Sequence, residues 1–209
     1  MTAPEIRRYV DLSHTVHDGL QTYPGLPAPV ICDYLSREDS RSHYAPGTEF
    51  QIGKIEMVAN TGTYVDFPFH RYADGEDLSE VSLERFVDLE SVTIRAPHRL
   101  TLAVDVDHFK NVELHGKAVL VHTGWSEYWE TPEYFEGHPF LTEAAAVLLR
   151  DSGVKLVGID ALNIDDTRGG SRPVHSTLLR SGCHFLFTAV PPKFQGVGTF
   201  PVRAFARVP

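Results

Sequence analysis

The segment Lys117–Thr123 is almost continuously apolar, and this run constrains the fold more than any other feature of the sequence. A strand with one wet face alternates apolar and polar residues, whereas an unbroken apolar run is typical of a strand buried on both faces. The segment Lys155–Asp160 is a further buried strand, and it ends on an acidic residue. Strands of this kind, alternating with a few helices, predict an α/β fold with a mixed sheet.

Weaker patterns predict the remaining elements. We expect further strands at residues 8–13, 50–59, 91–96, 185–190 and 201–205, and short helices at 83–87 and 176–182. In the strand at 50–59 the apolar positions change parity near Gly53, which predicts a β-bulge. The clearest helix has Thr142 as its expected N-cap and ends at Gly153. Its apolar face is expected to comprise Ala144, Val147 and Leu148.

Length and composition bound the class of protein. A chain of 209 residues with few helices suits a single α/β domain over residues 1–209 rather than a doubly wound fold. The net charge of -9 argues against nucleic acid or an anionic membrane as partner, and no apolar run is long enough to span a bilayer. The segment Met1–Glu5 lacks a secretion signal, and the distant Cys32 and Cys183 lack metal-finger spacing. We therefore expect a cytoplasmic protein.

The stretch Asn60–His70 carries the strongest indication of chemistry. A β-branched, apolar approach leads into a Gly-Thr turn, which is followed by an acid, a proline and a histidine. Asp66 and His70 stand four residues apart, and Pro68 restricts the backbone between them. Such a pair suits either an oxygen and a nitrogen ligand for a metal, or a carboxylate beside a general base. The alternative for Asp66 is an acid that merely caps a turn.

A second histidine stands out among the eleven in the chain. His175 lies where a helix begins, after a loop that contains Asp160, Asp165 and Asp166. A histidine there can face a cleft while the backbone holds its ring, or it can simply donate to a nearby carbonyl. The loop acids could reach the same site as oxygen ligands, although acids in loops usually face water.

With these segments in view, the chain resembles the cyclase family of metal-dependent hydrolases, which includes bacterial kynurenine formamidases and isatin hydrolases. The family signature H-x-G-T-H-x-D-x-P-x-H aligns with Asn60–His70 without a gap. Other segments that agree, in order, are Tyr23-Pro24-Gly25, Leu120–Trp125, Gly158-Ile159-Asp160, Pro173–Leu179 and Gly198–Ala204. The resemblance covers nearly the whole chain and implies a swivelling β/α fold with a barrel-like core, a cytoplasmic enzyme, and a homo-oligomer, either a dimer or a tetramer.

The resemblance also implies one or two divalent metals, often zinc or manganese. Within the family's ligand set Asp66 and His175 are retained, and the signature's last histidine, a general base or acid, corresponds to His70. Asn60 and Tyr64 replace the two signature histidines that bind metal. The family's later Glu has no match, because the chain passes from Ser181 almost directly to Val190 and looks shortened there.

These replacements leave metal binding open. An amide is a weak neutral ligand, and a phenol binds poorly unless the metal deprotonates it. Asp66 and His175, with His70 as a third ligand, could still hold a catalytic zinc, and an oxygen-rich set would favour manganese or magnesium. Without metal, Tyr64 could donate a hydrogen bond to a carbonyl while Asp66 orients His70.

We therefore expect a hydrolase that attacks the C–N bond of a small amide, formamide or cyclic amide, with water activated by His70 with or without a metal. Tyr23, Asn60 and Trp125 are the expected substrate-binding residues. A lactone hydrolase, a dehydratase or a cyclase acting on an acyl intermediate would need the same groups. A non-catalytic protein that binds a small molecule is the remaining alternative, because a fold does not fix a function.

Overall fold

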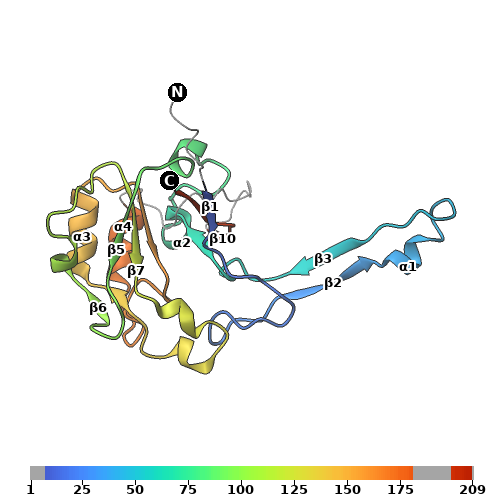
Figure 1. Cartoon of the computed structure of the whole chain (residues 1–209), viewed down its shortest axis with the longest axis horizontal. Helices are drawn as coiled ribbons and strands as arrows, with labels where there is room; N and C mark the ends of the chain where they lie inside the picture. Colours follow the sequence, from blue (N-terminus) through green and yellow to red (C-terminus); the bar gives the residue numbers. More distant parts are fainter. Residues whose placement is uncertain (1–7, 181–198, 209) are drawn as a thin grey trace.

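A three-stranded parallel sheet forms the centre of the computed structural model, which describes residues 8–180 and 199–208 (Figure 1). Its strands are β5 (Ser91–Arg95), β7 (Ala118–His122) and β9 (Leu156–Ile159), in the order β5-β7-β9. The strand at residues 117–123, which was predicted to be buried on both faces, is therefore the central strand β7. Ala118 packs into one apolar cluster and Val119 into another, so both faces of β7 are covered, as its apolar run predicts.

Two helices cover one face of this sheet. They are α3 (Glu143–Asp151) and α4 (Pro173–Arg180), which pack against each other and, with Val119 and Val157 of the sheet, enclose the larger core cluster. The N-cap is Thr142, as predicted, and Gly153 follows the helix with a φ of 70°. The predicted apolar face is confirmed only in part: Leu148 packs against the core, but Ala144 is exposed and the fully buried residues are Ala145, Ala146 and Leu149. Helix α4 begins at Pro173, earlier than predicted, since proline suits the first turn of a helix.

The opposite face of the sheet packs against a set of small antiparallel pairs. Strand β4 (Tyr64–Asp66) pairs with β10 (Thr199–Pro201), and β1 (Arg8–Asp11) pairs with β11 (Phe205–Val208). The single strand predicted at 201–205 is thus two strands, which pair with different partners. The α/β class is confirmed, but within the described ranges the strands form separate small sheets and do not close a barrel.

Short elements fill the connections. Strands β6 (Ala103–Val104) and β8 (Phe140–Leu141) pair in parallel, and α2 (Pro68–Arg71) follows β4. The 3-10 helices are η1 (Leu83–Arg85), η2 (Val106–Phe109), η3 (Trp125–Tyr128) and η4 (Pro132–Phe135). The helix predicted at 83–87 is the first of these, and the strand predicted at 185–190 lies outside the described residues. No helix in the described part of the chain is both long and apolar enough to cross a bilayer.

A long hairpin extends from this body (Figure 1). Strand β2 (Val30–Leu35) pairs antiparallel with β3 (Ile52–Glu56), and the short helix α1 (Arg37–Ser40) lies between them. The register shifts between Asp33 and Leu35, opposite Gly53, so the predicted irregularity occurs there, with the extra residue on β2. The prediction included β3 but not β2.

The N-cap of α3 offers a direct test of the hydrogen bonds that hold the start of this helix. The Thr142 hydroxyl accepts from the backbone N–H of Ala145 (3.1 Å) and donates to Asp105 Oδ1 (2.7 Å). The substitution Thr142→Ala removes both bonds, and we expect it to lower the free energy of unfolding by about 1–2 kcal/mol in a urea titration. Thr142→Ser, which keeps the hydroxyl, should retain most of this stability. Equal unfolding midpoints for the alanine variant and the parent chain would contradict the assignment.

Candidate active site

Strand β4 directs the polar residues of the Asn60–His70 stretch to one side. Side chains alternate along a strand, so the fully buried Val65 and Phe67 enter the core while Tyr64 and Asp66 face the opposite way. Gly62, just before the strand, has a φ of 68°, and a Cβ there would lie 2.8 Å from the Val16 side chain. Only glycine therefore suits this turn, because both the backbone conformation and the space exclude a side chain.

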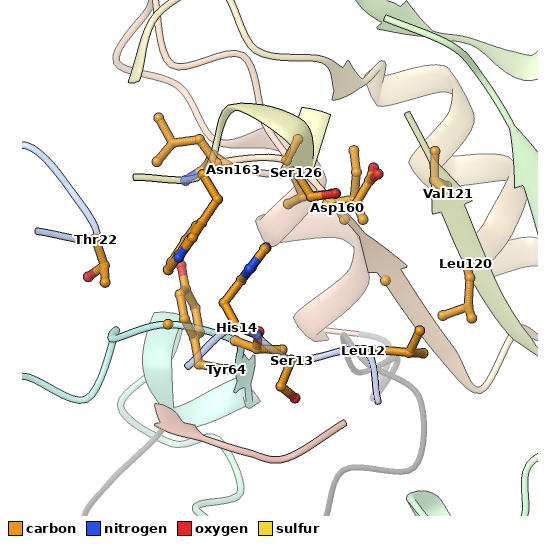
Figure 2. A pocket seen from close by; sticks show the side chains of 18 of the residues that line it. Leu12, Ser13, His14, Thr22, Tyr64, Leu120, Val121, Ser126, Asp160 and Asn163 are labelled. Atoms are coloured by element: carbon orange, nitrogen blue, oxygen red, sulfur yellow. The ribbon is translucent and has the colours of Figure 1, made fainter. Parts of the chain in front are cut away.

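Tyr64 and Asp66 line a cavity of about 530 Å³ between the β4 region and the carboxyl ends of β7 and β9. Figure 2 shows His14 and Tyr64 reaching into it from one side, with Asp160 and Asn163 opposite. Its size lies in the range of small-molecule sites. Further lining residues are Asp11, Leu12, Ser13, Thr22, Tyr23, Asn60, Gly62, Thr63, Thr93, Leu120, Val121, His122, Ser126, Trp129, Tyr134, Gly158, Ile159, Ala161, Leu162, Ile164 and His175.

The buried carboxylate of Asp165 sets the position of His175 in the first turn of α4. Its oxygens accept from the backbone N–H of Val174 (2.8 Å) and of His175 (3.1 Å), and one of them also lies 2.5 Å from His175 Nδ1. The same acid therefore satisfies the helix start and holds the imidazole, which leaves Nε2 directed to the cavity side. The loop acid Asp165 is thus a positioning group.

Asp66 lies between two imidazoles. His175 Nε2 is 3.6 Å from its Oδ2, and His70 Nε2 is 3.9 Å from its Oδ1. Burial alone would lower the pKa of His175, but the hydrogen bonds and charges of Asp165 and Asp66 outweigh it and raise this pKa to about 9. His175 is therefore a cation at neutral pH, held between two carboxylates. The structure thus brings Asp66 of β4 and His70 of α2 together with His175 of α4, which lies far from both in the sequence.

Tyr64 stays a neutral phenol. Enclosure by protein raises its pKa first, and the charge of Asp66 raises it further, while a hydrogen bond with Asn60 acts in the opposite direction. A protonated phenol at the wall of a cavity is a hydrogen-bond donor. The two residues that replace the family's histidines, Asn60 and Tyr64, therefore form a neutral polar pair beside Asp66.

Asp160 joins two of the segments that carried the resemblance. Its carboxylate accepts from the Thr123 backbone N–H (2.7 Å), the Thr123 hydroxyl (2.6 Å) and the Gly124 N–H (2.8 Å). Gly124 has a φ of 78°, which suits glycine at this turn. The G-I-D and T-G-W segments are thus one hydrogen-bonded unit at the carboxyl ends of β9 and β7, where parallel sheets commonly place their sites.

The cavity also contains residues that the sequence did not single out. His14 stacks on Trp129 with ring centroids 4.3 Å apart and an interplanar angle of 5°. Burial lowers the pKa of His14, so its ring is neutral at neutral pH. Tyr134 adds a second aromatic wall. The one sequence signal for His14 is its position just after the first strand, where polar loop residues often serve a site.

Some predicted residues lie elsewhere. His70 and Trp125 are not among the residues that line the cavity, although His70 Nε2 lies 3.9 Å from Asp66 Oδ1. The Trp125 indole donates to the Tyr134 carbonyl (3.1 Å), so it supports a wall instead. Asp166 pairs with Arg168 at the surface. Tyr23 and Asn60 do line the cavity, as expected of substrate-binding residues.

The residues of this cavity do not fit the metal that the resemblance implies. Within residues 8–180 and 199–208, no group of three or more His, Cys, Asp and Glu side chains is arranged to hold a metal ion. Asp66 and His175 would supply two donors, the expected third ligand His70 does not line the cavity, and the neutral amide and phenol of Asn60 and Tyr64 are weak donors. This set falls short of the three strong protein ligands of a catalytic zinc site.

The His175–Asp165 pair predicts a pH-dependent stability. The pKa of His175 in the folded protein is raised above the usual 6.5. The contribution of the protonated His175 to the free energy of unfolding is therefore fully present below about pH 6.5 and is lost as the pH rises through about 9. We expect a loss on the order of 3 kcal/mol between these limits in urea titrations. Asp165→Asn should reduce this loss, whereas Asp166→Asn, beside it on the surface, should leave it unchanged. The same pH profile in all three proteins would show that the pair does not form.

Comparison with known proteins places the chain in a family. The profile of the Cyclase family matches residues 10–166. A kynurenine formamidase from Geobacillus thermodenitrificans is 26% identical over 181 residues, which cover 85% of this chain and 80% of that protein. One from Bacillus cereus is 26% identical over 189 residues, with 87% and 82% covered.

Solved structures share the fold. Isatin hydrolase A from Ralstonia solanacearum matches with a TM-score of 0.81 at 20% identity, over 100% of this chain and 99% of that one. A "predicted metal-dependent hydrolase" from Bacillus stearothermophilus matches with a TM-score of 0.77 at 23% identity, over 97% and 99%. These matches confirm the predicted α/β class. Because the family profile spans most of its length, this chain belongs to the Cyclase family of enzymes.

Proposed function

We propose that this protein hydrolyses the C–N bond of a small amide, formamide or cyclic amide. The observation that carries the proposal is the position of Asp66, between two imidazoles and beside a neutral phenol, at the wall of a cavity sized for a small molecule. Relatives named kynurenine formamidase and neighbours named isatin hydrolase support the same bond type. The substrate is therefore a small molecule whose reacting carbonyl reaches Tyr64 and Asp66.

Tyr64 is the proposed donor to the carbonyl oxygen. Its phenol keeps its proton at neutral pH, and Asn60 holds it by a side-chain hydrogen bond. A fixed O–H donor stabilises the negative charge that develops on the oxygen as water adds. The imidazolium of His175, between Asp165 and Asp66, adds a positive charge on the same side of the cavity. Both groups would stabilise the transition state more than the neutral substrate.

His70 is the proposed general base. His70 does not itself line the cavity, but its Nε2 lies 3.9 Å from Oδ1 of Asp66, which does, so it would act on a water molecule beside Asp66; its side chain is 36% exposed. A carboxylate beside an imidazole orients the ring and stabilises the imidazolium that forms when water gives up a proton. The same proton can then pass to the leaving nitrogen. His175 suits this role less, because its raised pKa keeps it protonated at neutral pH.

The walls of the cavity favour a planar substrate. The stacked pair of His14 and Trp129 presents a flat surface, and Tyr23 and Tyr134 supply further aromatic area. Aromatic walls bind flat apolar groups by offset stacking or edge contacts. An N-formyl or cyclic amide of an aromatic amine would place its ring here and its carbonyl near Tyr64.

Two further properties belong to this proposal. We infer a cytoplasmic location, which the exposed free thiol of Cys32 supports, because such thiols suit a reducing compartment. We also infer a homo-oligomer.

A divalent metal is not part of the mechanism, since Asn60 and Tyr64 are weak donors and no step above requires one.

The base assignment is tested by replacing His70. We expect His70→Gln to lower kcat for an N-formyl aromatic amine by at least about 100-fold, the usual contribution of a general base. His43→Gln, an exposed histidine on the turn after α1, is the matched control and should retain full activity. Unchanged turnover by the His70 variant would remove it from the mechanism. Lactones and cyclic imides assayed in parallel would separate C–N hydrolysis from the other reactions of the same fold.

Metal removal gives an independent test. Because the cavity lacks three strong ligands in the described residues, we expect full activity after dialysis against a chelator, and no gain when Zn²⁺ or Mn²⁺ is added back. Metal content is measured on the same samples. Loss of turnover on chelation, restored by added metal, would overturn the metal-free mechanism while leaving the C–N hydrolase assignment intact.

A further inference from the structure

A second cavity of about 230 Å³, here called the side cavity, lies at the carboxyl ends of β5 and β7. The loops that follow these two strands form its walls, and its charged or titratable lining residues are Arg95, His98, Arg99, His122 and Glu127. A site for a whole small molecule usually measures about 300–1,000 Å³. The side cavity therefore suits a substituent of a ligand better than a whole ligand.

The side cavity adjoins the main cavity, which contains Tyr64 and Asp66, along one face of the parallel sheet. His122 lines both cavities. In the strand register Thr93 pairs with Leu120, and both line the main cavity, while Arg95 pairs with His122. Residues two apart on a strand lie on the same face, about 7 Å from each other, so Arg95 stands one step beyond the wall formed by Thr93. A substituent that leaves the main cavity past His122 would reach Arg95.

Arg95 is the cation of the side cavity that is left without an acidic partner. It is exposed, and no carboxylate in residues 8–180 and 199–208 forms an ion pair with its guanidinium. Arg99, by contrast, donates to both oxygens of Glu127 (3.1 and 3.2 Å), and His98 Nε2 lies 3.2 Å from the same carboxylate. Two arginines and one glutamate leave one positive charge here, in a chain whose net charge is -9.

Asp160 does not cancel this charge. Its carboxylate lies 3.9 Å from His122 Nε2 and follows β9, whereas Arg95 ends β5 on the other side of β7. Three hydrogen bonds from Thr123 and Gly124 already satisfy the Asp160 oxygens. An anion beside Arg95 would therefore be separated from Asp160 by the His122 ring.

The wall that carries these groups is fixed to β7. The Ala96 N–H donates to the His122 carbonyl (3.0 Å), and the His98 N–H donates to the Thr123 carbonyl (2.9 Å). His98 Nδ1 donates to the same Thr123 carbonyl (3.0 Å), since a carbonyl oxygen only accepts. The loop after β5 is thus ordered before any ligand arrives, which lowers the free-energy cost of binding.

We propose that the side cavity binds a carboxylate carried by the substrate, and that Arg95 recognises it. This inference rests on the proposed function, because the carboxylate belongs to the molecule whose carbonyl reaches Tyr64. One net positive charge suits a singly charged carboxylate better than a doubly charged phosphate, and a guanidinium can donate to both carboxylate oxygens at once. Arg95 is thus a specificity-determining residue, and the preferred substrate is an aromatic amide with an acidic substituent.

The first test compares acidic and neutral forms of one substrate. N-formyl-aminophenylacetates, with the acidic group ortho, meta or para to the formamide, are assayed beside the corresponding phenylacetamides, which lack the charge. We expect kcat/KM of the parent chain to be at least about tenfold higher for the best acid than for its amide, because the amide loses the charge-assisted hydrogen bonds. Arg95→Gln should remove this preference, and Arg95→Lys, which keeps the charge, should retain part of it. Arg150→Gln, which removes the same charge from α3, is the matched control and should keep the full preference.

A binding measurement separates the side cavity from the reaction. The expected products, the aminophenylacetates and aminophenylacetamides, are titrated into the parent chain and into Arg95→Gln by calorimetry, with circular dichroism to verify folding. We expect the parent chain to bind the best acid at least about tenfold more tightly than its amide, and the variant to bind both equally.

The outcomes distinguish the two proposals. Equal binding of acid and amide by the parent chain, or a preference that persists in Arg95→Gln, would overturn the role of the side cavity whether or not the formamides are hydrolysed. Binding that depends on Arg95, without turnover of any formamide, would support the carboxylate site and contradict the C–N hydrolase.

Discussion

The buried carboxylate of Asp165 is the interaction on which the site depends. It accepts from two backbone N–H groups at the start of α4 and from the imidazole of His175, so one side chain fixes both a helix and a functional group. Its burial makes this arrangement costly to break, because a buried carboxylate that loses its partners is strongly destabilising. His175 in turn faces Asp66, which connects α4 to β4. The position of His175 at the cavity therefore depends on the hydrogen bonds that Asp165 makes at the start of α4.

Much of the fold could be predicted from apolar patterning. The run in Lys117–Thr123 identified the central strand, because burial on both faces leaves Ala118–Val121 entirely apolar. The face of α3 was predicted only in part: Leu148 packs against the core, but Ala144, Ala145 and Ala146 are identical and a pattern cannot decide among them. Strand β2 was missed for a different reason: it is exposed on most of its length, so its sequence carries no burial pattern.

The candidate site was predictable only in part. Asp66 and His175 came from segments that resemble a family, and the structure places them in contact range. The stacking of His14 on Trp129 could not be predicted, because it depends on the approach of segments more than a hundred residues apart. The same limit explains Trp125, whose aromatic character was visible but whose direction, into a supporting contact with Tyr134, is a tertiary property. The sequence alone shows that Asn60 and Tyr64 stand where the family has two ligand histidines. The structure adds that the Tyr64 phenol stays neutral.

The position of β7 between two apolar clusters has a consequence for how the molecule comes apart. Ala118 belongs to one cluster and Val119 to the other, so a displacement of β7 would disturb both clusters. A local opening at Leu120 or Val121, both at the cavity wall, would have to disrupt both cores at once. We therefore expect this wall of the cavity to open less readily than the segments facing it, which are less deeply packed into the core.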